Sequence, residues 1–141
     1  MPGKKQHLEH LRGISLFASC TDKELAKVAK ASDEVAVGAG TTFVDQGQTG
    51  REAFVLLTGS ATVRRNGKKI ATLGPGAVIG ELALLDRGPR TASVTTDVDS
   101  TVLVIDQRHF TPILDEVPTL SHKILAGLAG KIRDLDRQYY G

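Results

Sequence analysis

The sequence has very little cysteine, no long apolar segment and almost no excess of either charge. Its one cysteine, Cys20, excludes an internal disulfide bond and a zinc site built from cysteines. We expect Cys20 to be a small, partly buried residue near the start of a helix. No run approaches the roughly 20 apolar residues that span a membrane, and residues 1–13 lack the apolar region of a signal peptide. These absences favour a cytoplasmic protein that does not bind a membrane by itself.

The formal net charge of +2 is too small to indicate a nucleic-acid-binding protein on its own. The composition is otherwise that of an ordinary globular protein, with 40% hydrophobic and 24% charged residues. Since domains most often contain about 100–150 residues, the length of 141 residues predicts a single domain over residues 1–141.

Helical patterns occupy both ends of the chain, residues 1–33 and 107–141. In the first, Thr21 with Glu24 three positions later forms a capping-box pattern, which predicts a helix over 22–31. In the second, Asp106 predicts the cap of a helix over about 107–115, and Pro118 suits the first turn of a last helix.

The last helix carries a single apolar stripe at spacings of three and four residues, and we expect it to be buried. Its members are Leu120, Ile124, Leu128, Ile132, Leu135 and Tyr139. Gly127 and Gly130 also lie within this helix, where each costs about 1 kcal/mol relative to alanine. We expect close packing to explain both glycines, with a partner helix or a ligand as the alternative.

Between these ends, residues 34–106 consist of short β-branched runs separated by glycine turns, which indicates a sandwich or barrel. Asn66-Gly67 predicts a two-residue type I′ hairpin, because both residues accept a positive φ. Four basic residues flank this turn: Arg64, Arg65, Lys68 and Lys69. They could contact nucleic acid, but without an aromatic residue nearby we favour a solvated sheet edge and no nucleic-acid partner.

The stretch GELALLDRGPRTASV, residues 80–94, concentrates the residues that can carry function. Gly80 allows the backbone to approach a ligand, and the N–H groups at the start of a helical turn over 82–85 would face an anion. Arg90 follows Pro89 and is expected to open a strand, from which its guanidinium can reach a phosphate beside the same turn.

Glu81 limits what this anion can be, because a carboxylate repels a bare phosphate. It can accept a hydrogen bond from a sugar hydroxyl, or it can form a structural ion pair with Arg90. The spacing alone leaves both interpretations open. A nucleotide with a phosphodiester and a free ribose hydroxyl would satisfy Gly80, Glu81 and Arg90 together.

The same stretch resembles the phosphate-binding cassette of the cyclic nucleotide-binding domain family, which occurs in catabolite activator proteins, protein kinase A regulatory subunits and cyclic nucleotide-gated channels. VDQGQTGREAFVLLTGSATV, residues 44–63, resembles the family's β-roll entry, with Gly47 and Gly59 at its usual turns. The resemblance covers nearly all of residues 10–139. It implies a mainly β fold, an eight-stranded antiparallel β-roll (jelly roll) with N-terminal helices and two C-terminal helices.

Transferred position by position, the resemblance implies that Glu81 accepts from the ribose 2′-hydroxyl and that Arg90 holds the cyclic phosphate. The other implied ligand-binding residues are Gly80, Leu82, Ala83 and Ala92 through their backbone, Thr91 beside the phosphate or base, and Lys131 from the last helix near the base. Thr91 leaves the base open, and we expect cAMP rather than cGMP. Arg87 has no implied role and is expected to be exposed.

Two features depart from the family pattern. Val78-Ile79 stands where the family often has an aromatic residue before its Gly-Glu, which we expect to alter packing more than binding. The sequence also ends at Gly141 without a helix-turn-helix, kinase or channel segment. We therefore expect the output domain to be missing or to lie on another chain, and a DNA-reading transcription factor to be excluded.

An enzyme of similar architecture, such as a cupin, would hold a metal through histidines inside the barrel. The four histidines, His7, His10, His109 and His122, all fall in the helical segments. We therefore expect no metal, no catalytic residues and no enzyme activity.

The predicted function is a regulatory module that binds a cyclic nucleotide and signals through its C-terminal helix to a second copy or to a partner protein. The alternative is a scaffold or dimerisation domain of the same fold that binds no ligand.

Overall fold

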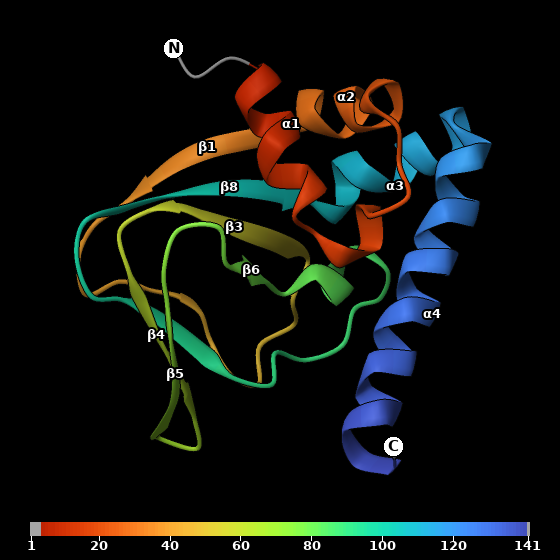
Figure 1. The fold of residues 1–141 in the computed structure, drawn as a ribbon. Helices are drawn as coiled ribbons and strands as arrows, with labels where there is room; N and C mark the ends of the chain where they lie inside the picture. Colours follow the sequence, from red (N-terminus) through yellow and green to blue (C-terminus); the bar gives the residue numbers. More distant parts are fainter. Residues whose placement is uncertain (1–3, 141) are drawn as a thin grey trace. The chain divides into compact units, whose positions relative to one another are not determined.

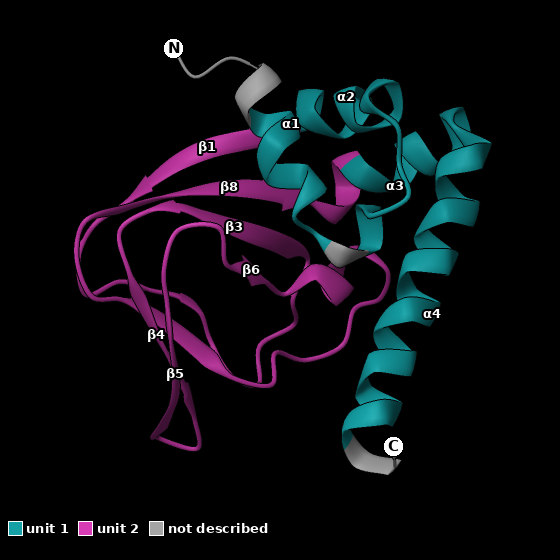
Figure 2. Ribbon diagram, viewed as in Figure 1, with its two compact units in different colours: residues 1–31, 110–141 teal, residues 32–109 magenta. Residues whose placement is uncertain are grey.

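The computed structural model describes residues 4–140, apart from the side chains of residues 4–6, 15, 139 and 140. The chain divides into two compact units (Figure 2). One unit is helical and joins the segment that ends at Ala31 to the segment that begins at Phe110. The other unit, Ser32–His109, contains all the described strands. The expectation of a single domain over residues 1–141 stays a prediction.

The strand unit contains eight strands in two antiparallel sheets of four (Figure 1). One sheet has the order β1-β8-β3-β6 and the other has the order β2-β7-β4-β5. The bounds are β1 Ser32–Val37, β2 Thr42–Val44, β3 Glu52–Thr58, β4 Ala61–Arg65, β5 Lys68–Leu73, β6 Val78–Ile79, β7 Ser93–Thr96 and β8 Ser100–Asp106. The predicted eight-stranded β-roll with flanking helices is therefore confirmed.

Alternating side chains of both sheets form the core of this unit. Phe54 and Leu56 of β3 are buried with Val102 of β8, and they belong to the same cluster as Val44 and Val94 of the second sheet. Each such side chain contributes about 1.5–3 kcal/mol of hydrophobic stabilisation when it is fully buried. The packing of the two sheets against one another thus holds β3 in place.

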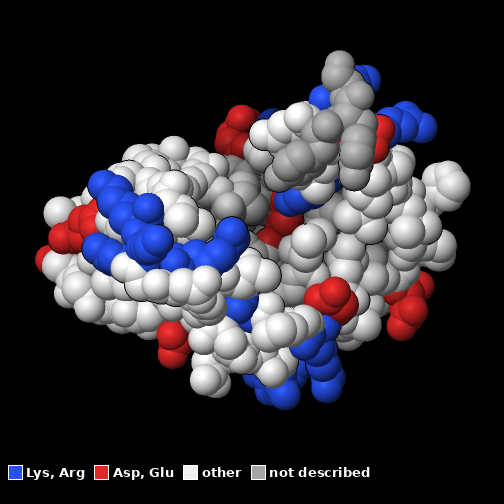
Figure 3. Space-filling view, turned by 90° about the horizontal axis from the view of Figure 1, so that it is seen from below, with Lys and Arg blue, Asp and Glu red and all other residues white. Residues whose placement is uncertain are grey.

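The hairpin between β4 and β5 has the predicted turn. Asn66 has φ of 53° and Gly67 has φ of 78°, and Arg65 pairs with Lys68 across the turn. The Gln46 side chain also holds the turn, because its amide donates to Asn66 Oδ1 at 2.8 Å and its carbonyl accepts from Asn66 N at 2.9 Å. Lys and Arg side chains form a group over this end of the hairpin, at the left of Figure 3.

The helical segments are α1 Lys4–Arg12, the 3₁₀ turn η1 Ser15–Phe17, α2 Asp22–Lys30, α3 Gln107–Glu116 and α4 Pro118–Tyr140. The predicted capping box is present in full: Thr21 Oγ1 accepts from Glu24 N, and Glu24 Oε1 accepts from Thr21 N. Asp106 caps α3 by accepting from Arg108 N at 2.8 Å. Local sequence signals therefore locate these helix starts correctly.

The prediction that the whole apolar stripe of α4 is buried was wrong in part. Leu120 and Ile124 are buried, but Ile132 is 59% exposed and Leu135 is 49% exposed. The Tyr139 side chain lies outside the described residues. Among the described residues, an added Cβ at Gly130 would meet no atom within 4 Å, so packing inside the helical unit does not explain this glycine, and the expected packing stays a prediction.

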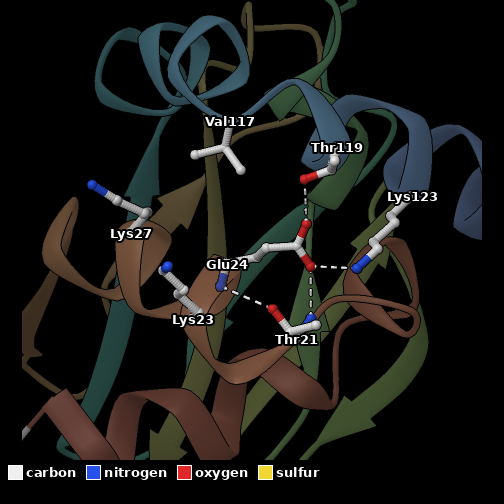
Figure 4. A pocket seen from close by; sticks show the side chains of 7 residues that line it. All are labelled: Thr21, Lys23, Glu24, Lys27, Val117, Thr119 and Lys123. Atoms are coloured by element: carbon white, nitrogen blue, oxygen red, sulfur yellow. Dashed lines mark hydrogen bonds and ion pairs between the residues drawn. The ribbon is translucent and has the colours of Figure 1, made fainter.

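A buried carboxylate joins α2 to α4 within the helical unit (Figure 4). Glu24 Oε1 accepts from Lys123 Nζ at 2.5 Å and Oε2 accepts from the Thr119 hydroxyl at 2.8 Å. The hydrogen bond from the Lys123 ammonium, followed by the bond from Thr21 N, lowers the pKa of Glu24 to about 2. A neighbouring cavity of about 440 Å³ is lined by Thr21, Lys23, Glu24, Lys27, Val117, Thr119 and Lys123.

We predict that Glu24→Gln lowers the free energy of unfolding at pH 7 by about 1.5–3 kcal/mol, because it removes charge-assisted bonds to Lys123 and Thr119. The pKa of Glu24 is depressed in the folded state, so this contribution is complete above about pH 4.5 and declines as the pH falls towards 2. Urea unfolding of both proteins between pH 2 and 7 measures it.

Glu9→Gln is the matched control, since Glu9 is also helical and paired, to Arg12, but its side chain is 69% exposed. It should cost less than about 1 kcal/mol. A constant difference between wild type and Glu24→Gln from pH 7 to pH 2 would contradict the assigned role of the Glu24 charge.

Candidate functional site

The site is built around Gly80, which lies between β6 and the 3₁₀ turn η2, Glu81–Leu84. Gly80 has φ of 68°, a conformation that favours glycine, and an added Cβ there would collide with Arg90 Nη1. The predicted turn over 82–85 is thus displaced by one residue and is tighter than an α-helical turn. Its Ala83 N–H donates to the Gly80 carbonyl at 3.0 Å.

Arg90 lies beside Gly80, as the sequence predicts, but it does not open a strand. Strand β7 begins at Ser93, and Arg90 belongs to an irregular segment that bonds the β2–β3 loop. Arg90 N donates to the Gln48 carbonyl at 2.8 Å, and Gly47 N donates to the Arg90 carbonyl at 2.9 Å. Pro89 has no N–H to donate, so it cannot continue a regular hydrogen-bonded element up to Arg90. The Arg90 backbone is held instead by the β2–β3 loop.

The Arg90 guanidinium is held from two further directions. Nη2 donates to the Glu52 carbonyl at 2.7 Å, and Cζ lies 5.8 Å from the centroid of the Phe54 ring. Burial lowers the pKa of Arg90, while the Glu52 carboxylate raises it. The other N–H groups of the guanidinium donate to none of the residues that the structure describes. A cation held in this way is suited to binding an anion.

Glu81 is buried, with 8% of its surface exposed, and it directly follows Gly80. Since burying a carboxylate is costly unless it has polar partners, its position at this turn favours a polar role. The structure thus places Arg90 against Gly80, the residue that directly precedes Glu81.

The remaining predicted residues of the cassette lie in the same unit. Leu82 is 45% exposed and Ala83 is buried. Thr91 is exposed and Ala92 is half-buried, and the Thr91 carbonyl accepts from Arg65 Nε at 3.0 Å. Arg87 is exposed, as expected. The ligand-binding role of each residue stays a prediction.

Lys131 belongs to α4, in the helical unit, where it is half-buried. Its predicted contact with the base is therefore untested.

Three residues that hold Arg90 were not predicted: Gly50, Glu52 and Phe54. All three lie in the β2–β3 loop or at the start of β3, close to 40 residues before Arg90 in the chain. They fall within the stretch that resembles the family's β-roll entry. That resemblance was their only sequence signal, since nothing local to them indicates an arginine.

No group of three or more potential metal ligands occurs among residues 4–140 with described side chains. The four histidines lie in helices, His7 and His10 in α1, His109 in α3 and His122 in α4. Within the described chain, no helix is both long and apolar enough to span a membrane.

Comparison with known proteins identifies the fold and the family. Residues 34–117 match the family model described as "Cyclic nucleotide-binding domain". The Pycsar effector protein XpPycTIR of Xanthomonas perforans is 34% identical over 97 residues, which is 68% of this chain and 32% of that protein. The cAMP-dependent protein kinase regulatory subunit of Aspergillus niger is 30% identical over 122 residues, 85% of this chain and 30% of that protein. The chain thus spans under a third of either curated relative.

Among solved structures, the N-terminal domain of a transcriptional regulator from Streptomyces coelicolor A3(2) superposes with a TM-score of 0.82 at 29% identity. The match covers 91% of this chain and 95% of that domain.

Proposed function

Because the chain belongs to the cyclic nucleotide-binding domain family, we propose that it binds a cyclic nucleotide reversibly, cAMP in preference to cGMP, and regulates without catalysis. The domain family itself is regulatory. Relatives named as cAMP-dependent and relatives named as cGMP-dependent both resemble the chain, so the preference for cAMP stays a prediction. The expected cytoplasmic location and the expected lack of a nucleic-acid partner stay predictions.

The Arg90 guanidinium is the observation that carries this proposal. It is half-buried beside Gly80, donates one hydrogen bond to the Glu52 carbonyl and has donors to spare for a phosphate. The cyclic phosphate carries the negative charge that a partly desolvated guanidinium binds well. Gly80, without a side chain, allows that phosphate to approach the backbone.

In the proposed complex, Glu81 accepts a hydrogen bond from the ribose 2′-hydroxyl. A buried carboxylate at this turn selects a neutral donor rather than a second anion, so it orients the sugar while Arg90 orients the phosphate. Thr91 is exposed next to Arg90 and could contact the phosphate or the base. Lys131 of α4 would contribute on the base side.

The proposed output is helix α4. Within the helical unit, α4 packs against η1, while Leu125, Ile132 and Leu135 expose apolar surface. We propose that nucleotide binding shifts the position of α4 and that its apolar surface transmits the signal to a second copy or a partner. Binding can shift this helix only by as much as the nucleotide prefers one position over the other.

Replacing Arg90 by alanine should weaken cAMP binding by about 2–5 kcal/mol, a loss of roughly 30- to 4,000-fold, because the phosphate charge then lacks its partner. Isothermal titration calorimetry measures this loss. Arg87→Ala is the matched control, an exposed arginine of the same segment that should leave the dissociation constant within about twofold. Equal affinities of wild type and Arg90→Ala would refute the phosphate assignment.

Thermal unfolding with increasing cAMP or cGMP separates ligand binding from the scaffold alternative. A ligand at 100 times its dissociation constant stabilises the folded state by about 2.7 kcal/mol. We expect the melting temperature to rise with both nucleotides and to rise at lower concentration with cAMP. If neither nucleotide raised the melting temperature at millimolar concentration, the chain would be better described as a scaffold.

Light scattering with and without cAMP tests the output surface. If α4 carries the contact between copies, Ile132→Glu should reduce the molar mass of the assembly and leave the cAMP affinity unchanged. Asp134→Asn, an exposed change on the same helix, is the control and should not alter the mass. A wild-type protein that is monomeric with and without cAMP would direct the search towards a different partner protein.

A further inference from the structure

The Arg90 side chain lies in a narrow slot whose wall on one side is Gly50. A Cβ added at Gly50 would lie 2.5 Å from Arg90 Nε, 2.6 Å from Cζ and 2.8 Å from Cδ. Real Cβ atoms essentially never come within 3.0 Å of a heavy atom to which they are not bonded, so either the new Cβ or the Arg90 side chain would have to shift. The guanidinium therefore occupies space that exists only because residue 50 has no side chain.

Backbone conformation does not explain this glycine. The glycines with positive φ in the described chain are Gly40, Gly47, Gly59, Gly67, Gly76 and Gly80. Gly50 is absent from this set, so alanine can adopt its φ without the strain that a left-handed residue would cause. Space for Arg90 is the requirement that remains at this buried position.

The other walls of the slot determine where a displaced guanidinium can go. Nη2 donates a hydrogen bond to the Glu52 carbonyl and Cζ lies over the Phe54 ring, while Nη1 lies where a side chain at Gly80 would begin. A Cβ at residue 50 would have to separate from Nε by at least 0.5 Å, from 2.5 to 3.0 Å. That displacement moves the guanidinium relative to both Glu52 and Gly80.

We propose that Gly50 is a positioning residue for the phosphate site: its missing side chain sets where the Arg90 guanidinium lies. This inference rests on the proposed function for the identity of the anion, the phosphate of a cyclic nucleotide. Displacing a binding group by as little as about 1 Å can cost roughly 100-fold in function. Gly50 would then control nucleotide affinity without touching the nucleotide.

The competing explanation is that the β2–β3 loop itself requires glycine at position 50, independently of Arg90. Gly50 lies in the loop that pairs with the Gly88–Arg90 segment, and its N–H donates to the Gly88 carbonyl at 3.3 Å. If only this loop needed a glycine, alanine at residue 50 would destabilise the fold to the same degree whether or not an arginine stood at position 90.

A double-mutant cycle separates the two explanations. Four proteins are compared: wild type, Gly50→Ala, Arg90→Ala and the double variant. Calorimetry with cAMP measures affinity, and urea unfolding without ligand measures stability. We expect Gly50→Ala to weaken cAMP binding about 10- to 100-fold in the Arg90 background, and to have no further effect on affinity once Arg90 is alanine.

The urea-unfolding measurement does not depend on any ligand. Gly50→Ala should lower the urea midpoint when Arg90 is present and should not lower it in Arg90→Ala, because alanine at position 90 leaves room for the new Cβ. Gly38→Ala is the control, since a Cβ there would meet only Thr41 Oγ1, at 4.0 Å. It should leave both affinity and midpoint unchanged.

The outcomes distinguish this inference from the proposed function. The positioning role of Gly50 would be overturned if Gly50→Ala bound cAMP within twofold of wild type. It would also be overturned if alanine at position 50 lowered the stability equally with arginine and with alanine at position 90. A protein that fails to fold with alanine at position 50 in both backgrounds would also overturn it. If Arg90→Ala binds cAMP like wild type, the phosphate assignment fails. A stability loss in urea unfolding that requires both Arg90 and alanine at position 50 would still support the positioning role of Gly50.

Discussion

The site depends on one constraint, which is that a half-buried guanidinium must be held without being neutralised. Burial lowers the pKa of Arg90, and the Glu52 carboxylate and carbonyl partly offset this cost. A full ion pair would bind the arginine more tightly but would leave less of its charge for an anion. Support through one carbonyl, one aromatic ring and two glycines keeps the group in place and leaves its charge available.

This support depends on contacts between segments that are distant in the chain. The groups around Arg90 come from the β2–β3 loop, the start of β3 and the end of β6. Strands β3 and β6 are neighbours in one sheet, and the loop reaches the Gly88–Arg90 segment through the Thr49–Pro89 bridge. Pairing of strands that are distant in the chain thus brings together groups that local structure could not.

The features that could be predicted from the sequence are those that depend on local contacts, and the features that were missed depend on distant ones. The Thr21–Glu24 capping box, the Asn66-Gly67 turn and the Asp106 cap each depend on residues within a few positions, and all three were predicted correctly. Glu81 and Arg90 were chosen from spacing and family resemblance. Their neighbours Gly50, Glu52 and Phe54 could not be derived from local signals, because their contacts with Arg90 cross about 40 residues of chain.

The predicted apolar stripe of α4 failed in part for a related reason. Periodicity marks the stripe of α4 but does not say how far the helix continues past its packing partner, so Ile132 and Leu135 are exposed although they continue the pattern. A pattern records which face is apolar, and only the tertiary structure shows what covers that face.

Phe54 connects the stability of the roll to the chemistry of the site. Its ring is 6% exposed, belongs to the core cluster and meets the Phe43 ring edge to face at 5.2 Å. The same ring lies under the Arg90 guanidinium. Because this ring packs in a core built from both sheets, the core helps to fix where the cation lies, together with the loop that bonds the Arg90 backbone. The core therefore does more than stabilise the fold, since one of its rings also contacts the Arg90 guanidinium.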